Sequence, residues 1–265
     1  MLVTIDVGNT QTVIGLFGPG DGPAGSGPDL LHTWRVATVS QRTADELALL
    51  LSQLFDLQDL GLAGTVSGLA VASVVPRLRT AMREMTDRWL PVPTVIVEPG
   101  IKTGMPILYD NPREVGADRI ADAVAAFDRY GGPTIVVDFG TATTFEVVSA
   151  KGEYLGGVIL PGIEISLEAL FARAALLPRV ELVEPPTVLG KNTVESVQSG
   201  AIYGFAAQVD GLCQRLEQEV GPATVVATGG LAGLIGPVTH SVDHHEPWLT
   251  LQGLRIIYGR NRPAE

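Results

Sequence analysis

The chain alternates between apolar runs of strand length and segments with helical periodicity. β-Branched, strand-like runs cover Leu2–Val7, Thr12–Phe17 and Leu30–Val36. Gly8-Asn9-Thr10 separates the first two runs and has the composition of a hairpin turn. The glycine- and proline-rich stretch Gly18–Pro28 is typical of a long hairpin loop rather than of a linker between domains. The pattern therefore predicts three consecutive strands joined by hairpins.

Helical patterns follow in the first half. Thr43 and Glu46 form a capping box, which predicts that a helix begins there. Leu69–Val75 has the pattern of a buried strand, and Pro76 suits the first turn of a second helix. The expected apolar faces are Leu47, Leu50, Leu51 and Leu54 on the first helix, and Leu78, Met82, Met85 and Trp89 on the second.

The second half repeats this order. Thr134–Asp138 and Thr144–Ser149 are strand-like runs on either side of the turn Gly140-Thr141-Ala142, and Glu153–Leu160 predicts a third strand. Further along, we expect a helix that opens at Pro161-Gly162, a long helix Val194–Val220 capped by Asn192, and strands at Thr224–Thr228 and Leu254–Tyr258.

Two similar turns lie half a chain apart. They are Asp6-Val7-Gly8-Asn9-Thr10 and Asp138-Phe139-Gly140-Thr141-Ala142-Thr143, and each sits between two apolar runs. Self-similarity at half length indicates that one α/β unit has been duplicated. We therefore expect an α/β fold with two domains, residues 1–115 and 116–265, whose turns face an interdomain cleft.

The composition indicates a folded, acidic protein. Apolar residues make up 46% of the chain, which is enough to bury a substantial core. The net charge of -11 opposes binding to nucleic acid or to anionic lipid. The lone Cys213 excludes an internal disulfide, and no signal-peptide pattern precedes the first strand. We therefore expect a cytoplasmic protein in which Cys213 is a small apolar residue on a helix.

An aspartate that ends a strand, followed by a glycine- and hydroxyl-rich turn, suits phosphate binding. Glycine lets backbone amides approach the anion, threonine hydroxyls add donors, and the aspartate binds a cation that bridges phosphate oxygens. One such turn often exists only for its shape, but two at matching positions favour a functional role. A third element, Gly229-Gly230 after a predicted strand, leaves room for a flat adenine against the backbone. The chain has no Walker loop and no dinucleotide fingerprint.

Asp118 and Arg119 lie at the start of a helix predicted from the stripe Ile120, Val124 and Phe127. A plain N-cap explains an aspartate at this position, but not the adjacent arginine. Asp118 can take the proton of a substrate hydroxyl as a phosphate bond forms, although an ordinary aspartate, with a pKa of about 3.9, is a weak base. The planar fork of Arg119 suits a carboxylate or amide oxygen. The pair predicts a kinase that acts on a small hydroxyl-bearing metabolite.

The order of these elements resembles the superfamily of actin, heat-shock chaperones and sugar kinases, which implies two ribonuclease H-like (actin-like ATPase) domains. Over essentially its whole length, the chain is similar to the type III pantothenate kinases, the first-step enzymes of coenzyme A synthesis in many bacteria. The segments that carry this similarity are DVGNTQTVIGLF, DNPREVGADR, DFGTATTFEVV, GGVILPGIEISLEAL, GKNTVESVQSG, ATGG and LTLQGL.

The resemblance implies a role for each matching residue. Asp118 would be the proton acceptor, Asp138 would hold a monovalent cation (potassium or ammonium), and Thr193 would reach the substrate. The pantothenate pocket would be lined by Tyr109, Gly116, Ala117, Asp118 and Arg119. The ATP contacts would be Asp6, Val7, Gly8, Asn9, Thr10, Gln11, Thr12, Val13 and Thr141.

The resemblance also implies ATP with Mg²⁺ as the phosphate donor and a homodimer with the active site near the subunit interface. Gly200, Ala201 and Gly204 on the long helix permit close approach of a second subunit, although ordinary packing within the chain explains them as well. Gln11 stands where many relatives carry a second asparagine, which could alter one phosphate contact.

Some interpretations remain open. His240, His244 and His245, with Asp243 and Glu246 nearby, suggest a metal site, but Pro247 and the turn-like composition favour a polar surface loop. A transcriptional regulator and a phosphohydrolase on the same fold are the alternative functions. The chain has no basic patch for DNA, and Asp118-Arg119 favours an organic acceptor over water.

Overall fold

The computed structural model of the chain describes residues 1–19 and 29–262, so most of the predicted loop Gly18–Pro28 lies outside the described residues. The chain forms two compact units. Unit 1 is built from residues within Met1–Met105, Asn111–Ala125 and Thr250–Glu265, and unit 2 from Pro106–Asp110 and Ala126–Leu249. The sequence suggested two consecutive domains that meet at residue 115. The two units are instead made of alternating segments of the chain, and the C-terminal segment belongs to unit 1.

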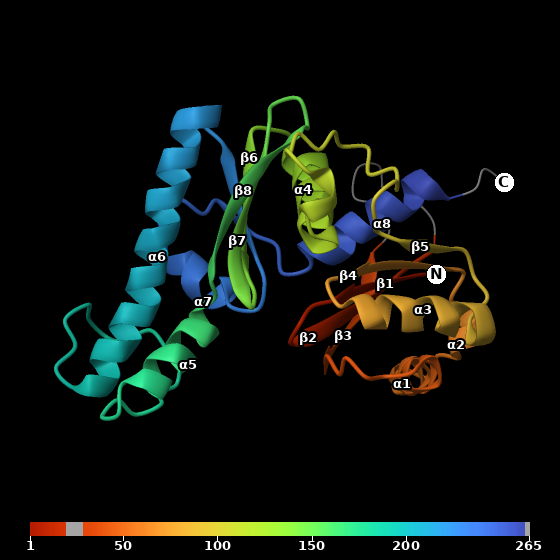
Figure 1. Cartoon of the computed structure of the whole chain (residues 1–265), viewed down its shortest axis with the longest axis horizontal. Helices are drawn as coiled ribbons and strands as arrows, with labels where there is room; N and C mark the ends of the chain where they lie inside the picture. The colour runs from red at the N-terminus through yellow and green to blue at the C-terminus, as the bar shows by residue number, and fades with distance from the viewer. Residues whose placement is uncertain (20–28, 263–265) are drawn as a thin grey trace. The chain divides into compact units, whose positions relative to one another are not determined.

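Unit 1 contains a five-stranded mixed sheet (Figure 1). Its strands are β1 (Leu2–Val7), β2 (Gln11–Phe17), β3 (Leu30–Ala37), β4 (Gly68–Ser73) and β5 (Thr94–Ile96). The order across the sheet is β3-β2-β1-β4-β5. β2 runs antiparallel to β1 and β3, and β4 runs parallel to β1 and β5. The predicted run of three antiparallel strands is therefore confirmed.

Unit 2 contains a second five-stranded sheet. Its strands are β6 (Thr134–Phe139), β7 (Ala142–Val148), β8 (Tyr154–Pro161), β9 (Thr224–Thr228) and β10 (His244–His245). The order is β10-β9-β6-β7-β8, with β7 antiparallel to β6 and β8, and β9 parallel to β6 and β10. Beginning from the β8 edge, this is the strand order and direction of unit 1.

The repeat extends to the register of the strands. In unit 1, Asp6 pairs in parallel with Ala72, next to the last residue of β4. In unit 2, Asp138 pairs in parallel with Thr228, the last residue of β9. The predicted duplication of an α/β unit is confirmed by this common topology, and each aspartate lies near the carboxyl end of the central strand of its sheet.

Two helices cover one face of the unit 1 sheet (Figure 1): α1 (Ala44–Asp56) and α3 (Pro76–Trp89), with the short α2 (Leu62–Thr65) between them in sequence. Leu50 of α1 is only half-buried, and Phe55 is fully buried in its place, so the apolar face is rotated from the expected one. The core between sheet and helices includes Val3, Ile5, Val7, Leu47, Leu51, Phe55, Leu78, Met82 and Met85.

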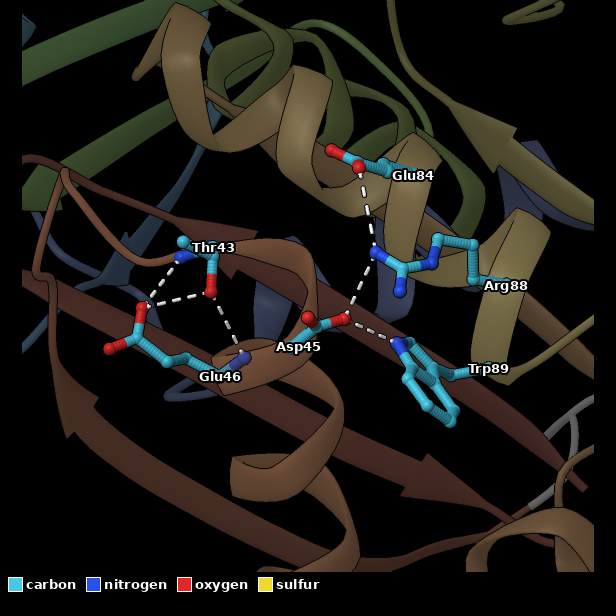
Figure 2. Close-up of polar contacts among 6 residues, drawn as sticks. All are labelled: Thr43, Asp45, Glu46, Glu84, Arg88 and Trp89. Carbon is cyan, nitrogen blue, oxygen red and sulfur yellow. Dashed lines mark hydrogen bonds and ion pairs between the residues drawn. The ribbon is translucent and has the colours of Figure 1, made fainter.

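Trp89 was expected in the buried stripe of α3, but its side chain is 52% exposed. Figure 2 shows that its indole Nε1 donates to Asp45 Oδ1 over 2.7 Å. Arg88 Nη1 lies 3.1 Å from the same oxygen and 3.7 Å from Glu84 Oε1. The expectation was wrong because an indole N–H needs an acceptor, and the start of α1 supplies one at the surface. These contacts join the first turn of α1 to the last turn of α3.

The apolar run Leu254–Tyr258 was expected to form a strand, and this prediction was wrong. The run lies inside helix α8 (Leu249–Asn261), which packs on the opposite face of the unit 1 sheet. A Cβ at Gly15 would lie 2.9 Å from Leu251, and one at Gly68 would overlap the Tyr258 hydroxyl. A short run with four apolar residues and one arginine, Arg255, fits a helix as well as a strand, so periodicity could not separate the two.

Unit 2 carries α5 (Ile163–Arg173), α6 (Thr193–Val220) and α7 (Ala232–Ile235). Asn192 caps α6 as predicted, because its side chain accepts from Glu195 N over 2.9 Å. Cys213 is buried on α6, and burial, followed by the nearby Asp210, raises the pKa of its thiol to about 12. The thiol therefore stays protonated at neutral pH, as expected for a structural residue.

None of the helices that the structure describes is both long enough and apolar enough to cross a membrane.

The capping box at the start of α1 is confirmed, and it makes a testable contribution to stability. Thr43 N donates to Glu46 Oε2 over 2.7 Å, and Glu46 N donates to Thr43 Oγ1 over 3.3 Å (Figure 2). We expect Thr43→Ala to lower the free energy of unfolding by about 1 kcal/mol, measured by urea denaturation. Thr80→Ala on the exposed side of α3 is the control and should change this free energy by less than about 0.5 kcal/mol.

This contribution should also depend on pH. The hydrogen bond from the Thr43 backbone lowers the pKa of Glu46, so the stabilisation is present above the ordinary pKa of glutamate and is lost as the pH falls through the lowered value. The stability difference between the wild type and Thr43→Ala should therefore shrink in acid. A difference that stays constant down to pH 2 would contradict this account of the cap.

Candidate active site

The first predicted phosphate turn is the hairpin between β1 and β2. Gly8 N donates to Gln11 O over 3.0 Å, which closes the turn, and Thr10 O accepts from Thr38 N over 2.9 Å. A Cβ at Gly8 would lie 3.0 Å from Gln11 O, so this position tolerates a side chain poorly. Asn9 and Thr10 are exposed at the tip, and Asp6 is partly exposed at its base. Asn9 and Thr10 are thus exposed residues at a tight turn near the end of β1.

The side chain of Gln11 is occupied within the sheet. Its Oε1 accepts from Arg35 Nη1 of β3 over 3.0 Å. The neighbouring Thr12 hydroxyl shares a hydrogen bond of 2.8 Å with the Thr38 hydroxyl. The departure from asparagine at position 11 therefore adds a link from β2 to β3 and leaves the shape of the turn in place.

Asp118 lies in the first turn of α4 (Ala117–Tyr130) in unit 1. Its Oδ1 accepts from the backbone N of Arg119 over 2.9 Å, and Oδ2 has no partner among residues 1–19 and 29–262. A Cβ at Gly116 would overlap Oδ1, so the glycine makes room for the carboxylate to fold back over the helix start. This geometry holds Asp118 in one orientation and leaves one oxygen available as a hydrogen-bond acceptor.

Tyr109 lies beside strand β8 in unit 2. The preceding segment extends the sheet, because Leu108 N donates to Tyr154 O and Tyr154 N donates to Pro106 O, both over 2.8 Å. The Tyr109 ring packs edge-on against Tyr154, with 6.4 Å between ring centroids. A Cβ at Gly156 would meet the Tyr109 ring at 3.8 Å, and Gly156 has a φ of +144°. A Cβ at 3.8 Å would be an ordinary van der Waals contact, so the positive φ, and not the ring, favours glycine at position 156.

The second phosphate turn and the predicted adenosine turn meet at Asp138. A Cβ at Gly229, which has a φ of +92°, would overlap Asp138 Oδ1 and would lie 2.7 Å from Phe139 N. On the other side, a Cβ at Gly140 would lie 3.4 Å from Asp138 Oδ2. The carboxylate therefore lies between two glycines that come from different turns, and it is partly exposed.

The start of α5 lies against the same turn. Gly162 N donates to Thr141 O over 3.1 Å, and a Cβ at Gly162 would lie 2.6 Å from Gly140 O. Gly162 is the N-cap of α5 and makes no side-chain cap hydrogen bond. A helix N-terminus with unsatisfied amides favours anions. Unit 2 thus gathers a carboxylate, the exposed Thr141 and a helix N-terminus in one place.

Thr193 lies elsewhere in unit 2, at the first position of α6, where it is exposed. It borders a groove of about 780 Å³ between α5 and α6. Leu176, Val188 and Leu189, in the segment between these helices, are 95%, 67% and 76% exposed. The groove is lined by Ser166, Leu167, Leu170, Leu177, Gly190, Lys191, Asn192, Thr193, Ser196, Val197, Gly200, Ala201 and Phe205.

Two glycines shape the surroundings of Asp138 and Thr141. Gly229, which was expected as part of an adenosine turn, lies against Asp138, and Gly162, which was not expected to contribute to the site, lies against Gly140 and Thr141. In the sequence, the position of Gly229 directly after a predicted strand indicated a turn. Pro161-Gly162 was interpreted only as the start of a helix.

We expect Gly229→Ala to destabilise the protein and to weaken nucleotide binding. The new methyl group would collide with Asp138 and would also place alanine at a positive φ, which together should cost about 1–3 kcal/mol. Gly211→Ala in the middle of α6 is the matched control, because a Cβ there meets no atom within 4 Å. Urea denaturation and a fluorescent nucleotide titration test both effects. Equal stability and equal nucleotide affinity for the two variants would contradict the proposed packing.

Known proteins resemble the chain in sequence and in fold. The profile of the family described as Type III pantothenate kinase matches residues 2–215. A Type III pantothenate kinase of Streptomyces avermitilis is 55% identical, covering 98% of both chains. Two solved structures share the fold at low sequence identity. A Campylobacter jejuni protein, provisionally described as a Baf family transcriptional activator, is 17% identical, with a TM-score of 0.59 and 98% of both chains covered. An inorganic polyphosphate/ATP-glucomannokinase of Arthrobacter is 14% identical, with a TM-score of 0.51, covering 98% of this chain and 99% of that one. The chain therefore belongs to the type III pantothenate kinase family.

Proposed function

We propose that this protein transfers the γ-phosphate of ATP to the primary hydroxyl of pantothenate and forms 4′-phosphopantothenate, the first step of coenzyme A synthesis. The observation that carries the proposal is the repeated geometry of Asp6 and Asp138. Each is the second-to-last residue of the central strand of a five-stranded sheet, beside a parallel strand, and is followed by a glycine-containing hairpin. The choice of pantothenate as acceptor rests on the names of the full-length relatives.

The nucleotide contacts are assigned to both turns. Residues Asp6 to Val13 would hold the phosphates through the exposed amides around Asn9 and Thr10, where the tip of the hairpin is open. Thr141 and the first turn of α5 would add donors from unit 2. The adenosine would lie on the Gly229-Gly230 backbone, where the absence of a Cβ at Gly229 leaves space.

The cation sites fit this chemistry. Among the described residues, no group of three or more His, Cys, Asp or Glu side chains could hold a metal ion alone. Magnesium in kinases is usually held by one or two carboxylates and by the substrate phosphates, so Mg²⁺ would enter with ATP. The carboxylate of Asp138 is partly exposed between two glycines. We assign a monovalent cation, potassium or ammonium, to Asp138. When bound, these cations offset the negative charge that develops on the phosphates.

The acceptor would be held and activated by residues around the start of α4. Arg119 would bind the carboxylate of pantothenate, Gly116 and Ala117 would line its pocket, and the ring of Tyr109 would cover an apolar part. The hydroxyl oxygen forms a bond to the γ-phosphorus, the bond from that phosphorus to the bridging oxygen of ADP breaks, and the hydroxyl proton moves to Asp118 Oδ2. Positioning and charge stabilisation contribute most in such transfers.

We also propose that the protein is a cytoplasmic homodimer. The segment between α5 and α6 exposes apolar side chains, and residues of this segment, among them Leu177 and Gly190, line the groove next to Thr193. A second copy would cover this face and would bring Thr193 to the substrate. Exposed apolar patches of this kind usually mark an interface.

We expect Asp118→Asn to lower kcat by about 10²- to 10³-fold with little change in the KM of ATP, because the amide cannot take the proton. ADP release, measured with Mg²⁺ and potassium, should depend on pantothenate in the wild type. ADP release that ignores pantothenate would favour a hydrolase, and a normal kcat in Asp118→Asn would refute the assigned base. Nucleotide binding without any turnover would make a regulator the better explanation.

We expect Leu189→Glu to convert the dimer into a monomer, because it places a charge on an apolar face. Leu57→Glu is the control, since Leu57 at the end of α1 is 73% exposed, close to the 76% of Leu189, but lies in unit 1. Light scattering after gel filtration measures the mass of each variant. A wild-type monomer, or a Leu189→Glu variant that remains dimeric, would contradict the proposed interface.

A further inference from the structure

The three histidines of the segment His240–His245 have separate surroundings. His240 N donates to Asp210 Oδ1 over 2.9 Å, which fixes the loop that enters β10. The ring of His244 stacks on Tyr130, with 4.4 Å between centroids and 12° between planes. The ring of His245 lies on the side of α7, because a Cβ at Gly233 would be 3.5 Å from its Cε1. All three residues are exposed, and His244–His245 form the short strand β10 where a loop was expected.

His245 lies on the same edge of the unit 2 sheet as the adenosine turn. β9 and β10 are parallel, with His245 opposite Ala227. Thr228 ends β9, and Gly229-Gly230 follows it directly. Ligands of open α/β sheets bind at the carboxyl ends of parallel strands. His245 is the last residue of β10, so it occupies this edge next to the turn.

The path from the turn to His245 is short. Ala232 N donates to Gly229 O over 3.3 Å, and Ile235 N donates to Leu231 O over 3.0 Å, so the chain coils into α7 directly after the turn. Gly233 lies in α7, four residues after Gly229. The imidazole next to Gly233 is itself exposed. A flat group resting on the Gly229-Gly230 backbone would therefore lie beside the start of the helix that this ring contacts.

The residues on either side hold His245 in place. Glu246, which is 8% exposed, accepts from Tyr130 Oη over 2.5 Å and pairs with Arg129 Nη1 over 3.0 Å. Its backbone N donates to Ala227 O over 2.8 Å. With the stack of His244 on Tyr130, these contacts leave little freedom to the backbone of His245. A ring on a fixed backbone loses less entropy when it stacks on a ligand.

We propose that His245 binds the purine base of ATP by stacking its imidazole on the adenine, opposite the Gly229-Gly230 backbone. This inference rests on the proposed function, since it assigns a wall to the nucleotide site of that function. Aromatic side chains stack on any base, because every base has a π-face. His245 touches the base only, so it affects nucleotide affinity and has no part in the transfer step.

The test is a titration of N-methylanthraniloyl-ADP, followed by fluorescence, against the full-length wild type and three variants. His245→Ala should raise Kd about tenfold, the effect of losing one stacked ring, whereas His245→Phe should keep the affinity within about threefold. His240→Ala is the matched control and should bind as the wild type does. In turnover assays, His245→Ala should raise the KM of ATP and leave kcat and the KM of pantothenate unchanged.

Inorganic tripolyphosphate separates the base from the phosphates. Tripolyphosphate has no base. Its own Kd, obtained by competition with the fluorescent nucleotide, should therefore be the same for the wild type and His245→Ala. Unchanged nucleotide affinity in His245→Ala, or a His245→Phe variant as weak as His245→Ala, would overturn the stacking proposal. A wild type that binds no nucleotide at all would instead refute the proposed kinase, so the two failures are distinguishable.

Discussion

The parallel pairing between the first and fourth strand of each sheet is the constraint on which the rest of the structure depends. It places the aspartate at the end of the central strand beside the end of a crossover strand: Asp138 beside Thr228 in unit 2, and Asp6 beside Ala72 in unit 1. In unit 2 the chain then turns at Gly229, and the carboxylate and the turn are in contact only because that residue has no side chain. Strand register and one glycine thus bring together the carboxylate that we propose as a cation ligand and the turn that we propose for the nucleotide.

Helix α4 connects this framework to the acceptor chemistry. Six consecutive residues, 121 to 126, are buried, so the helix is held on all sides, while its first turn stays partly exposed. The carboxylate of Asp118 rests over Gly116 and accepts from the next backbone amide, which leaves one oxygen for a substrate. At the other end, the pair formed by Tyr130 and Glu246 ties the helix to β10. Because burial and the hydrogen bond to Glu246 raise the pKa of Tyr130 to about 12, its hydroxyl remains a donor at neutral pH.

Much of this architecture was predictable from the sequence. The hairpins, the capping boxes and the repeat were predicted from local rules, because turn composition and strand periodicity act over a few residues. The failures have a common cause: Leu254–Tyr258 forms a helix face against a sheet far away in sequence, and Trp89 finds its acceptor on another helix. Gly229 was predicted as a turn from its place after a strand, but its contact with Asp138, like that of Gly162 with Gly140, joins turns that are distant in sequence, and local patterns do not reveal it. The interleaving of the two units likewise depends on where the last helix packs.

A crystal structure of the protein with a non-hydrolysable ATP analogue, Mg²⁺, potassium and pantothenate tests the central claim most directly. Our account predicts phosphates against the amides of the Gly8–Thr10 turn and of Gly140-Thr141, a cation on Asp138, and the pantothenate hydroxyl within hydrogen-bond distance of Asp118. A nucleotide bound away from both turns, or a pantothenate hydroxyl directed away from Asp118, would contradict it.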